Sequence, residues 1–268
     1  MDSGKIVTVI QARTGSSRLP NKVMLSVCGK PLLLRMVERV YRAKLAGTVV
    51  IATSTRSEDD PIENLCAKEG LNCYRGHPTD LLERHYRAAV EYGAGAVAKI
   101  PSDCPLIDHT IIDKVFRHFI DNDFDFVSNL HPATYPDGND VEIFTFKALE
   151  TAFNEAVKNF EREHTTPFIW ERPDRFKIGN VVWETKHDFS STHRWTIDYE
   201  EDYIFIRSVY DELYEKKNDF GLYDILRLLE EKPYIHNINR KYAGRYWYDN
   251  HLNELNNITE YKNKRKTE

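Results

Sequence analysis

Three short segments of this sequence combine residue types that could perform phosphate chemistry. The first covers residues 11–22 and carries cations and small residues directly after an apolar run. The other two cover residues 101–108 and 195–198, where Asp103 and Asp198 each follow an apolar run. A basic loop can bind phosphates, and two carboxylates can hold magnesium against them. Together these groups meet the requirements of a magnesium-dependent nucleotidyl transfer.

The segment over residues 11–22 has the composition of a phosphate-binding loop. Its small residues would let backbone N–H groups and hydroxyls approach an anion closely, and its cations would offset the anion's charge. The residues concerned are Gly15, Ser16 and Ser17, together with Arg13, Arg18 and Lys22. The loop has neither the Walker A order nor the GxGxxG order, which disfavours a P-loop and a dinucleotide-binding fold. The alternative is an ordinary solvated basic loop.

Asp103 and Asp198 are candidate magnesium ligands, because magnesium prefers one or two carboxylates together with substrate phosphates. Each could instead cap the turn that follows its apolar run, and this alternative stays open for either residue taken alone. The acidic residues at 200–202 are expected to complement the N-terminus of a helix. Among the ten histidines, His164 is the most promising, and it could either reach an acceptor carboxylate or serve a helix end or an interface.

The spacing of apolar residues predicts the elements that would position these groups. Strand-like β-branched runs alternate with amphipathic stretches over the first 130 residues or so. The predicted strands cover residues 6–10, 48–53, 72–74, 96–100 and 125–128, and the predicted helices begin at 29–31, 57–61, 79–80 and 108. This alternation predicts an α/β fold with a mainly parallel sheet and helices on both faces. Ligands of such sheets bind beyond the carboxyl ends of the strands, where the loop at 11–22 and Asp103 can converge.

The alternation loosens after Leu130. Residues 131–140 are rich in proline, glycine, asparagine and aspartate, which predicts a loop. A strand over 141–144, helices over 146–160 and 163–171, a strand over 176–183 and a helix over 199–214 are expected to follow. We interpret the aromatic residues Tyr242 and 246–248 as core or as a subunit contact, and the basic run at 261–266 as a frayed or disordered tail.

The bulk composition excludes several classes of protein. Hydrophobic residues make up 41% of the 268 residues, so a sizeable core can form. A net charge of −5 argues against a general nucleic-acid binder but leaves room for a local cationic pocket. The apolar runs are too short to span a membrane. The four cysteines have no zinc-like spacing and no secretion signal is evident, so we expect small buried thiols in a cytoplasmic protein.

Taken in order along the chain, these segments resemble the sugar-activating cytidylyltransferases, the family that includes the 3-deoxy-manno-octulosonate and acylneuraminate cytidylyltransferases. The likeness is closest to the SpsF-type branch, named for spore-coat polysaccharide synthesis, and it covers the chain to about Tyr214. It rests on residues 11–22, 29–32, 75–76 with Asp80, 102–107, 135–142, 162–167 and 195–198. Several segments in a fixed order are more specific than any one of them.

The resemblance implies a nucleotide-diphospho-sugar-transferase-like (Rossmann-like) α/β fold in a single domain, residues 1–250. Residues 1–130 would form the nucleotide-binding half. Residues 131–250 would form the acceptor half, which would also pair two subunits into a homodimer, and residues 251–268 would form a polar, basic tail. The implied reaction joins CTP to a sugar acid or related polyol and gives a CMP-linked product and pyrophosphate, for surface polysaccharide or glycan biosynthesis. The implied cofactor is Mg2+.

The resemblance also assigns roles to individual residues. The catalytic residues would be Arg13, Lys22, Asp103 and Asp198, of which Asp103 and Asp198 would hold the metal. The nucleotide would be bound by Gln11, Ala12, Arg13, Gly15, Ser16, Ser17, Arg18, Lys22, Gly76, Asp80, Pro101 and Ser102. The acceptor would be bound by Asp137, Asp140, Glu142 and His164.

Three other functions stay open. The acceptor could be a phosphorylated alcohol, which would give a CDP-linked product. A glycosyltransferase of similar fold would need a DxD metal motif after a middle strand; residues 121–125 match this motif formally, but they precede a strand. The third is an inactive nucleotide-binding or scaffold protein. The presence of Arg13, Lys22, Asp103 and Asp198 in one chain argues against it.

Overall fold

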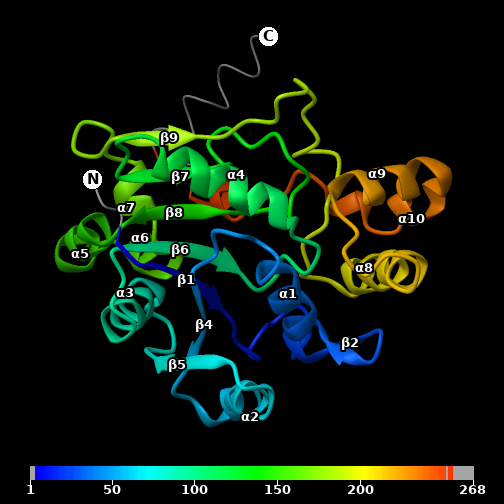
Figure 1. Cartoon of the computed structure of the whole chain (residues 1–268), viewed down its shortest axis with the longest axis horizontal. Helices are drawn as coiled ribbons and strands as arrows, with labels where there is room; N and C mark the ends of the chain where they lie inside the picture. The colour runs from blue at the N-terminus through cyan, green and yellow to red at the C-terminus, as the bar shows by residue number, and fades with distance from the viewer. Residues whose placement is uncertain (1–3, 252, 256–268) are drawn as a thin grey trace.

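A twisted sheet with helices on both faces forms the centre of the molecule (Figure 1). The computed structural model describes residues 4–251 and 253–255. Within them, seven strands form the main sheet in the order β5-β4-β1-β6-β8-β7-β9, from the bottom to the top of the view in Figure 1. Their bounds are β1 Ile6–Gln11, β4 Thr48–Ser54, β5 Asn72–Gly76, β6 Ala96–Pro101, β7 Phe126–Ser128, β8 Glu142–Thr145 and β9 Ile178–Asn180.

The sheet is mainly parallel, as predicted, but it contains one antiparallel strand. Strands β1, β4, β5 and β6 pair in parallel, as do β7 and β9, but β8 lies antiparallel between β6 and β7. The connection from β7 to β8 contains no helix, so the chain returns beside β7 instead of crossing over the sheet. Glu142, the first residue of β8, pairs with Lys99 and with Ser128. The start of β8 therefore lies at the same edge as the carboxyl ends of its neighbours.

Two hydrophobic clusters, one on each face of the sheet, explain the layered arrangement. Leu33, Phe116 and Phe205 belong to one cluster, and Leu82 and Leu149 belong to the other. Burial of such side chains contributes roughly 1.5–3 kcal/mol each, which makes these faces the main source of stability. The prediction of helices on both faces is confirmed. The helices are α1 Leu32–Val40, α2 Asp60–Glu69, α3 Leu81–Glu91, α4 His109–Ile120, α5 Phe146–Glu155, α6 Asn159–His164, α7 Pro167–Trp170, α8 Glu200–Leu213, α9 Leu222–Glu231 and α10 Pro233–Asn237.

Side-chain caps fix the beginnings of three helices. Asp80, Asp108 and Thr145 precede α3, α4 and α5, and the side chain of each accepts a hydrogen bond from a backbone N–H of the first turn. Such a cap satisfies one of the donors that the helix itself leaves free and contributes about 1 kcal/mol. The predicted helix starts at 79–80 and at 108 agree with these caps.

Several predicted elements are shorter or displaced in the structure. The helix predicted from 29–31 begins at Leu32, because Lys30–Pro31 (β3) pairs with Ser26–Val27 (β2) in a small antiparallel ladder. The stretch 146–171 forms three helices instead of two, since Thr165 adopts a positive φ of 72° and Pro167 starts a new turn. The strand predicted over 176–183 is reduced to the three residues of β9.

The C-terminal end of the described chain packs against the domain. His251 lies with its ring centroid 5.6 Å from that of Phe160, and Leu255 is 1% exposed within the second cluster. The basic run at 261–266, like most of the predicted tail 251–268, lies outside the described residues. Among the helices that the structure describes, none is long and apolar enough to cross a membrane.

Candidate active site

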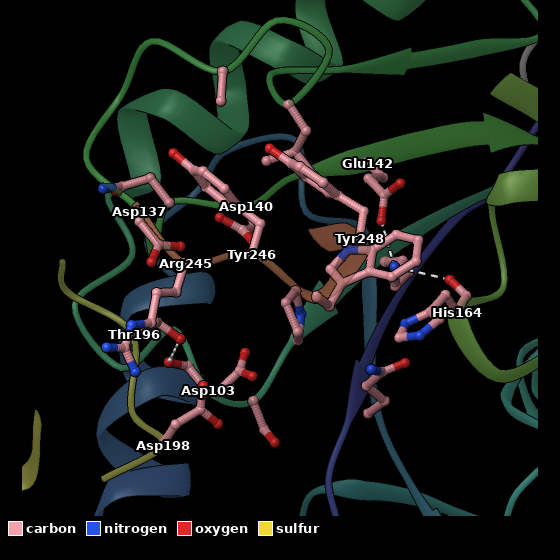
Figure 2. Close-up of a pocket in the computed structure, with 18 of the residues that line it drawn as sticks. Asp103, Asp137, Asp140, Glu142, His164, Thr196, Asp198, Arg245, Tyr246 and Tyr248 are labelled. Atoms are coloured by element: carbon pink, nitrogen blue, oxygen red, sulfur yellow. Dashed lines mark hydrogen bonds and ion pairs between the residues drawn. The ribbon is translucent and has the colours of Figure 1, made fainter. Parts of the chain in front are cut away.

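A cavity of about 720 Å3 opens where several strands end (Figure 2). Its walls come from the loop after β1, the end of β6, the segment between β7 and β8, helix α6, the segment before α8 and the segment at 245–249. These parts are far apart in sequence. They meet because parallel strands place their carboxyl ends at one edge of the sheet.

The loop after β1 is held in place by a buried carboxylate on a neighbouring connection. Asp59, which is 2% exposed, accepts hydrogen bonds from the backbone N–H and the hydroxyl of Thr14 at 2.7 and 2.8 Å. Burial would raise the pKa of Asp59, but hydrogen bonds from Ser54 and Thr14 outweigh it and lower the pKa. Asp59 therefore stays ionised at neutral pH and anchors the loop, so that the cations of the loop keep fixed positions at the cavity.

Lys22 lies between the two predicted metal ligands. Its Nζ is 3.0 Å from Asp198 Oδ1 and 3.7 Å from Asp103 Oδ2, and it donates a hydrogen bond to the carbonyl oxygen of Ile197 at 2.7 Å. The two carboxylate oxygens can be no farther apart than the sum of the two ion-pair distances. Arg18 contacts the same oxygen of Asp198 at 2.9 Å. Asp103 and Asp198 therefore face one small volume and not two separate surfaces.

Backbone hydrogen bonds explain why two residues so distant in sequence meet. The carbonyl oxygen of Asp103 accepts a hydrogen bond from the Ile197 N–H and another from the Thr196 hydroxyl, both at 2.9 Å. The segment before α8 is thus tied to the turn after β6. Asp198 follows directly and has its own N–H bonded to Asp202 at 2.9 Å. The relative position of the two carboxylates is set by the main chain as well as by Lys22.

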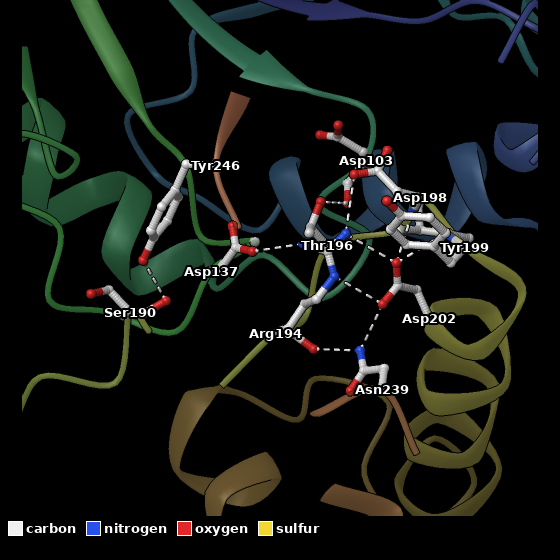
Figure 3. Close-up of polar contacts among 12 residues, drawn as sticks. Asp103, Asp137, Ser190, Arg194, Thr196, Asp198, Tyr199, Asp202, Asn239 and Tyr246 are labelled. Carbon is white, nitrogen blue, oxygen red and sulfur yellow. Dashed lines mark hydrogen bonds and ion pairs between the residues drawn. The ribbon is translucent and has the colours of Figure 1, made fainter. Parts of the chain in front are cut away.

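Arg194 connects the cavity to the buried base of α8 (Figure 3). Its side chain, 3% exposed, contacts Asp198 at 3.1 Å, Asp137 at 3.3 Å and both oxygens of Asp202 at 3.0 and 3.1 Å. Asn239 donates to the carbonyl oxygen of Arg194 and to Asp202, each at 2.9 Å. A guanidinium offers five donors in a rigid fork, which suits this shared contact with three carboxylates.

The acidic side chains of the cavity differ in their protonation. Burial would raise the pKa of Asp198, but the charges of Lys22, Arg18 and Arg194 outweigh it and lower the pKa. Burial and the nearby charge of Asp103 raise the pKa of Asp140 to about 7. Burial and Asp140 raise the pKa of Asp137 well above its usual value, although Arg194 opposes this. The cavity thus carries ionised carboxylate near the loop and partly protonated carboxyl groups deeper inside.

A second set of contacts lies near α6. Glu142 pairs with Lys99 Nζ at 2.5 Å and accepts a hydrogen bond from the Thr166 hydroxyl at 2.6 Å. Lys99 also donates to the carbonyl oxygen of His164 at 3.1 Å. Burial, with a smaller effect of Lys99, lowers the pKa of His164 to about 3. The imidazole is therefore neutral and would meet a ligand as a hydrogen-bonding or stacking group and not as a cation.

Most residues that the sequence assigned to the site line this cavity. Those that do are Gln11, Ala12, Arg13, Ser16, Ser17, Arg18, Lys22, Pro101, Ser102, Asp103, Asp137, Asp140, Glu142, His164 and Asp198. Arg13 is exposed and has no ion-pair partner among the described residues, so it is free to meet an anion. The Gln11 Oε1 atom is buried and has no hydrogen-bond partner among the residues that the structure describes. Gly15, Gly76 and Asp80 are not among the lining residues.

Gly76 and Asp80 have structural contacts beside the cavity. A Cβ on Gly76 would lie 2.7 Å from the Tyr74 ring and 3.0 Å from Arg84 Cγ, so the glycine allows Arg84 to approach. Asp80 caps α3 and contacts Arg162 Nε at 2.6 Å. The nucleotide-binding role that the resemblance gave them stays a prediction.

The structure adds cavity residues that sequence reasoning missed. Arg84, Lys99 and Arg194 line the cavity, and so do the aromatic residues 246–248. The three cations stand alone within helices, strands or loops, and nothing in the sequence distinguishes them from the rest of its 37 lysines and arginines. The aromatic cluster was visible in the sequence, and Trp247 and Tyr248 do pack against the second hydrophobic cluster. The sequence did not show that these partly buried side chains also line the cavity. The alternative interpretation as a subunit contact stays a prediction.

Asp103 and Asp198 both reach the Lys22 ammonium, so a cationic group already lies between the two carboxylates. Within residues 4–251 and 253–255, no group of three or more His, Cys, Asp or Glu side chains could hold a metal ion. A metal here would therefore need ligand oxygens to complete its coordination. Magnesium commonly binds in this way, through one or two carboxylates plus phosphates and water.

A family model described as cytidylyltransferase matches residues 7–237, from the start of β1 to the end of α10. The chain belongs to the cytidylyltransferase family. The resemblance inferred from the motifs is confirmed.

Two relatives match most of this cytidylyltransferase chain. An uncharacterised protein of Methanocaldococcus jannaschii is 35% identical over 238 residues, which cover 88% of this chain and 94% of the relative. The spore coat polysaccharide biosynthesis protein SpsF of Bacillus subtilis is 28% identical over 241 residues, which cover 85% and 95%. Both alignments extend through the nucleotide-binding and acceptor halves predicted from the sequence.

Solved structures give the same assignment. A cytidylyltransferase from Leptospira borgpetersenii serovar Hardjo-bovis superposes with a TM-score of 0.81 at 31% identity and covers 91% of this chain and 99% of its own. A CMP:2-keto-3-deoxy-manno-octonic acid synthetase solved with CTP superposes with a TM-score of 0.60 at 15% identity, over 78% of this chain and 99% of its own, which supports the fold. The α/β fold is therefore that of nucleotidyltransferases.

Proposed function

We propose that this cytidylyltransferase transfers CMP from CTP to a hydroxyl of a sugar acid or related polyol and releases pyrophosphate. The observation that supports this most directly is the position of Lys22 between Asp103 and Asp198, with Arg18 on the same carboxylate. It brings together cations for a triphosphate and carboxylates for a metal. The chain is also similar to SpsF and, over 44% of its length, to the 3-deoxy-manno-octulosonate cytidylyltransferase of Trichlorobacter lovleyi at 30% identity.

At one end of the cavity, the loop after β1 would hold the triphosphate. Arg13, Arg18 and Lys22 would contact its oxygens, and Arg13 has no competing carboxylate among the described residues. Their charge would offset the charge that develops on the leaving pyrophosphate. The acceptor oxygen attacks the α-phosphorus, the bond to the pyrophosphate breaks, and the acceptor hydroxyl gives up its proton. The protein would act mainly by positioning and by charge stabilisation.

Asp103 and Asp198 are the residues that would hold Mg2+. A bound magnesium ion would offset phosphate charge and make the acceptor hydroxyl more acidic. Asp198 is suited to this role because its pKa is lowered by Lys22, Arg18 and Arg194 against the effect of burial. Arg194 and the backbone contacts of Asp103 would keep both carboxylates in place.

The nucleobase would be cytosine. Gln11 Oε1 is a buried acceptor in the cavity with no partner among the described residues. The cytosine amino group could donate a hydrogen bond to it, whereas O4 of uracil could not. We expect turnover with CTP to exceed turnover with UTP at least tenfold, because leaving a buried acceptor unpaired costs about 1–3 kcal/mol. Equal rates with the two nucleotides would remove Gln11 from this role.

Pyrophosphate release from CTP in the presence of candidate acceptors tests the proposal, with the product weighed by mass spectrometry. A CMP-linked product supports it. A CDP-linked product from a phosphorylated alcohol would favour that alternative instead. Pyrophosphate release with neither type of acceptor would contradict the proposed function. The glycosyltransferase alternative predicts transfer from a nucleotide sugar, which the same assay would detect as free nucleotide.

We also propose that the half formed by residues 131–250 pairs two subunits into a homodimer. Strands β7–β9 break the βα alternation of the first half, and Val182 beside β9 is 48% exposed. A two-fold contact would use the same patch on each chain. Light scattering at micromolar concentration should give twice the mass of the chain, and a monomer would refute the pairing.

A further inference from the structure

Three consecutive aromatic residues form one wall of the cavity. Tyr246, Trp247 and Tyr248, called here the aromatic wall, all line it. In Figure 2, Tyr246 and Tyr248 lie on the side of Asp140 and Glu142, whereas Asp103 and Asp198 lie at the other end of the view. Tyr246 and Tyr248 are therefore placed at the part of the cavity that holds Asp140 and Glu142, away from Asp103 and Asp198.

Specific contacts fix the aromatic wall to both sides of the cavity. The Tyr246 hydroxyl donates to the carbonyl oxygen of Ser190 at 2.7 Å, and the rings of Tyr246 and Tyr248 stack at 4.9 Å with an interplanar angle of 9°. Trp247 stacks on His164 of α6 at 3.8 Å and 19°. The aromatic wall thus joins the segment before α8 to α6, and it crosses the cavity between them.

A glycine allows the chain to turn back over the cavity. Gly244 has a positive φ of 75°, and a Cβ there would lie 3.3 Å from the Ser191 carbonyl oxygen. A residue with a side chain would be strained in this backbone conformation. On the other side, Leu255 is buried in the second cluster, so the aromatic wall is anchored at both ends.

The aromatic wall lies close to the carboxyl groups of the acceptor side. Burial raises the pKa of Tyr246 to about 12 and raises that of Tyr248, with further effects of Asp137 and Asp140 on both. Both phenols therefore stay neutral, which leaves flat, uncharged rings beside hydrogen-bond acceptors. The combination of aromatic faces with convergent polar groups is typical of a binding pocket for a small molecule.

The aromatic wall also lies beyond the region that defines the family. The family model matches residues 7–237, and the wall begins nine positions later (246 − 237). The loop after β1, Asp103 and Asp198 are all within the matched region. The residues assigned to nucleotidyl transfer thus lie within the matched region, and the aromatic wall lies outside it.

We propose that the aromatic wall selects acceptors in ring form, packing against the C–H face of a sugar ring while Asp137, Asp140 and Glu142 accept hydrogen bonds from its hydroxyls. This inference rests on the proposed function, because it names the acceptor class of the same site. An open-chain polyol offers no flat apolar face to the rings. An open-chain polyol would therefore gain less binding free energy from contact with the aromatic wall than a pyranose of similar size.

Kinetics of wall variants test the inference. The acceptors are two sugar acids in ring form, 3-deoxy-manno-octulosonate and N-acetylneuraminate, and one open-chain compound, glycerol 3-phosphate. Trp247→Ala and Tyr248→Ala should each raise the KM for the ring-form acceptor at least tenfold and leave the KM for CTP within about twofold. Trp247→Phe should recover most of the loss. Tyr234→Ala, at an aromatic residue of α10 that is 64% exposed and does not line the cavity, is the matched control.

A binding measurement without turnover makes the test independent of catalysis. Calorimetric titration of each ring-form acid into the protein saturated with CTP in EDTA should show binding that Trp247→Ala weakens at least tenfold. Unchanged acceptor affinity in both wall variants, no binding of either ring-form acid, or a preference for glycerol 3-phosphate would overturn the inference. If CTP and the ring-form acid both bind but no product forms in the presence of magnesium, the proposed function fails while the inference on the wall stands.

Discussion

At the two ends of the cavity, aspartate side chains have pKa values that are shifted in opposite directions. At the nucleotide end, defined by the loop at 11–22 with Asp103 and Asp198, Asp198 touches Lys22, Arg18 and Arg194 and has a lowered pKa. At the acceptor end, defined by Asp137, Asp140, Glu142 and the aromatic wall, burial raises the pKa of Asp140 to about 7. Charged partners, not the type of residue, decide which carboxyl is ionised.

The difference corresponds to what each end would have to bind. A triphosphate with a metal ion needs fixed charges of both signs, and the nucleotide end supplies them. An acceptor rich in hydroxyls needs hydrogen-bond acceptors and flat apolar surface, and the acceptor end supplies these. Changes at the two ends should therefore have effects of different kind and size.

Removing a carboxylate charge at the nucleotide end should have the largest effect. Asp103→Asn and Asp198→Asn should each lower kcat about a hundredfold or more while the fold stays intact, because a preorganised charge is lost where the reaction develops charge. EDTA should have the same effect on the native protein, and added magnesium should restore it but not the variants. Pyrophosphate release measures the rates, and circular dichroism checks the fold.

Asp121→Asn is the control for these variants. Asp121 is exposed and belongs to the formal DxD motif of the glycosyltransferase alternative. Full activity of this variant is expected. If Asp121→Asn were inactive and Asp103→Asn active, the assignment of the nucleotide end would be wrong.

Removing the cation between the carboxylates should have the next largest effect. Lys22→Ala should lower kcat/KM for CTP at least tenfold, about 1.4 kcal/mol, because a charge-assisted contact to the triphosphate is lost. Lys30→Ala is the matched control, since Lys30 is 48% exposed and paired with Glu38 away from the cavity. Unchanged kinetics in Lys22→Ala would take this residue out of the site.

Neutralising the acceptor end should change the pH dependence of stability. Asp140 has a pKa of about 7 in the folded protein and an ordinary value of 3.8. At pH values between these two pKa values, the Asp140 carboxyl is ionised in the unfolded chain and protonated in the folded protein. Its contribution to the free energy of unfolding therefore falls as pH rises between the two pKa values, and it stays constant at higher pH. The Asp140→Asn variant has no carboxyl at this position, so its free energy of unfolding should not fall for this reason.

Denaturant unfolding at pH 4 and pH 8 in EDTA measures the difference. From pH 4 to pH 8, the unfolding free energy of Asp140→Asn should improve relative to the native protein by at least about 1.4 kcal/mol, the equivalent of one pKa unit. An identical pH dependence in the two proteins would contradict the state assigned to Asp140 and would remove the contrast between the two ends.

The smallest effect is expected beside the cavity, at a residue with structural contacts. Asp80 caps α3 and pairs with Arg162 but does not line the cavity. Asp80→Ala should lower the unfolding free energy by about 1 kcal/mol and leave the KM for CTP within about twofold, because a helix cap is lost and no ligand contact is. A tenfold rise in KM with unchanged stability would support the nucleotide-binding role that the resemblance gave Asp80.

The sequence predicted the nucleotide end better than the acceptor end for a physical reason. The loop at 11–22 and Asp103 are short segments at the ends of parallel strands, and the strands themselves have a clear apolar pattern. The helix caps Asp80 and Asp108 were likewise visible as local signals. Each of these predictions needs only residues that are neighbours in the chain.

The acceptor end depends on contacts that no local pattern contains. The direction of β8 is set by its pairing with β6 and β7, and its four residues would suit either direction. In the sequence, nothing marks Arg194 as a site residue. Its role follows only from the fold, which brings Asp137, Asp198 and Asp202 into contact with it. The aromatic residues 246–248 face the cavity only because Gly244 lets the chain turn beside Ser191.

The antiparallel direction of β8 has a consequence for the shape of the acceptor end. Since β7 ends and β8 begins at the same edge, the whole connection at 129–141 is displayed over the cavity and both of its ends are held by the sheet. Asp137 of this connection contacts Arg194, which also contacts Asp198, so the connection is linked to the nucleotide end. The shape of the acceptor end therefore depends on the direction of one short strand as well as on the side chains that line it.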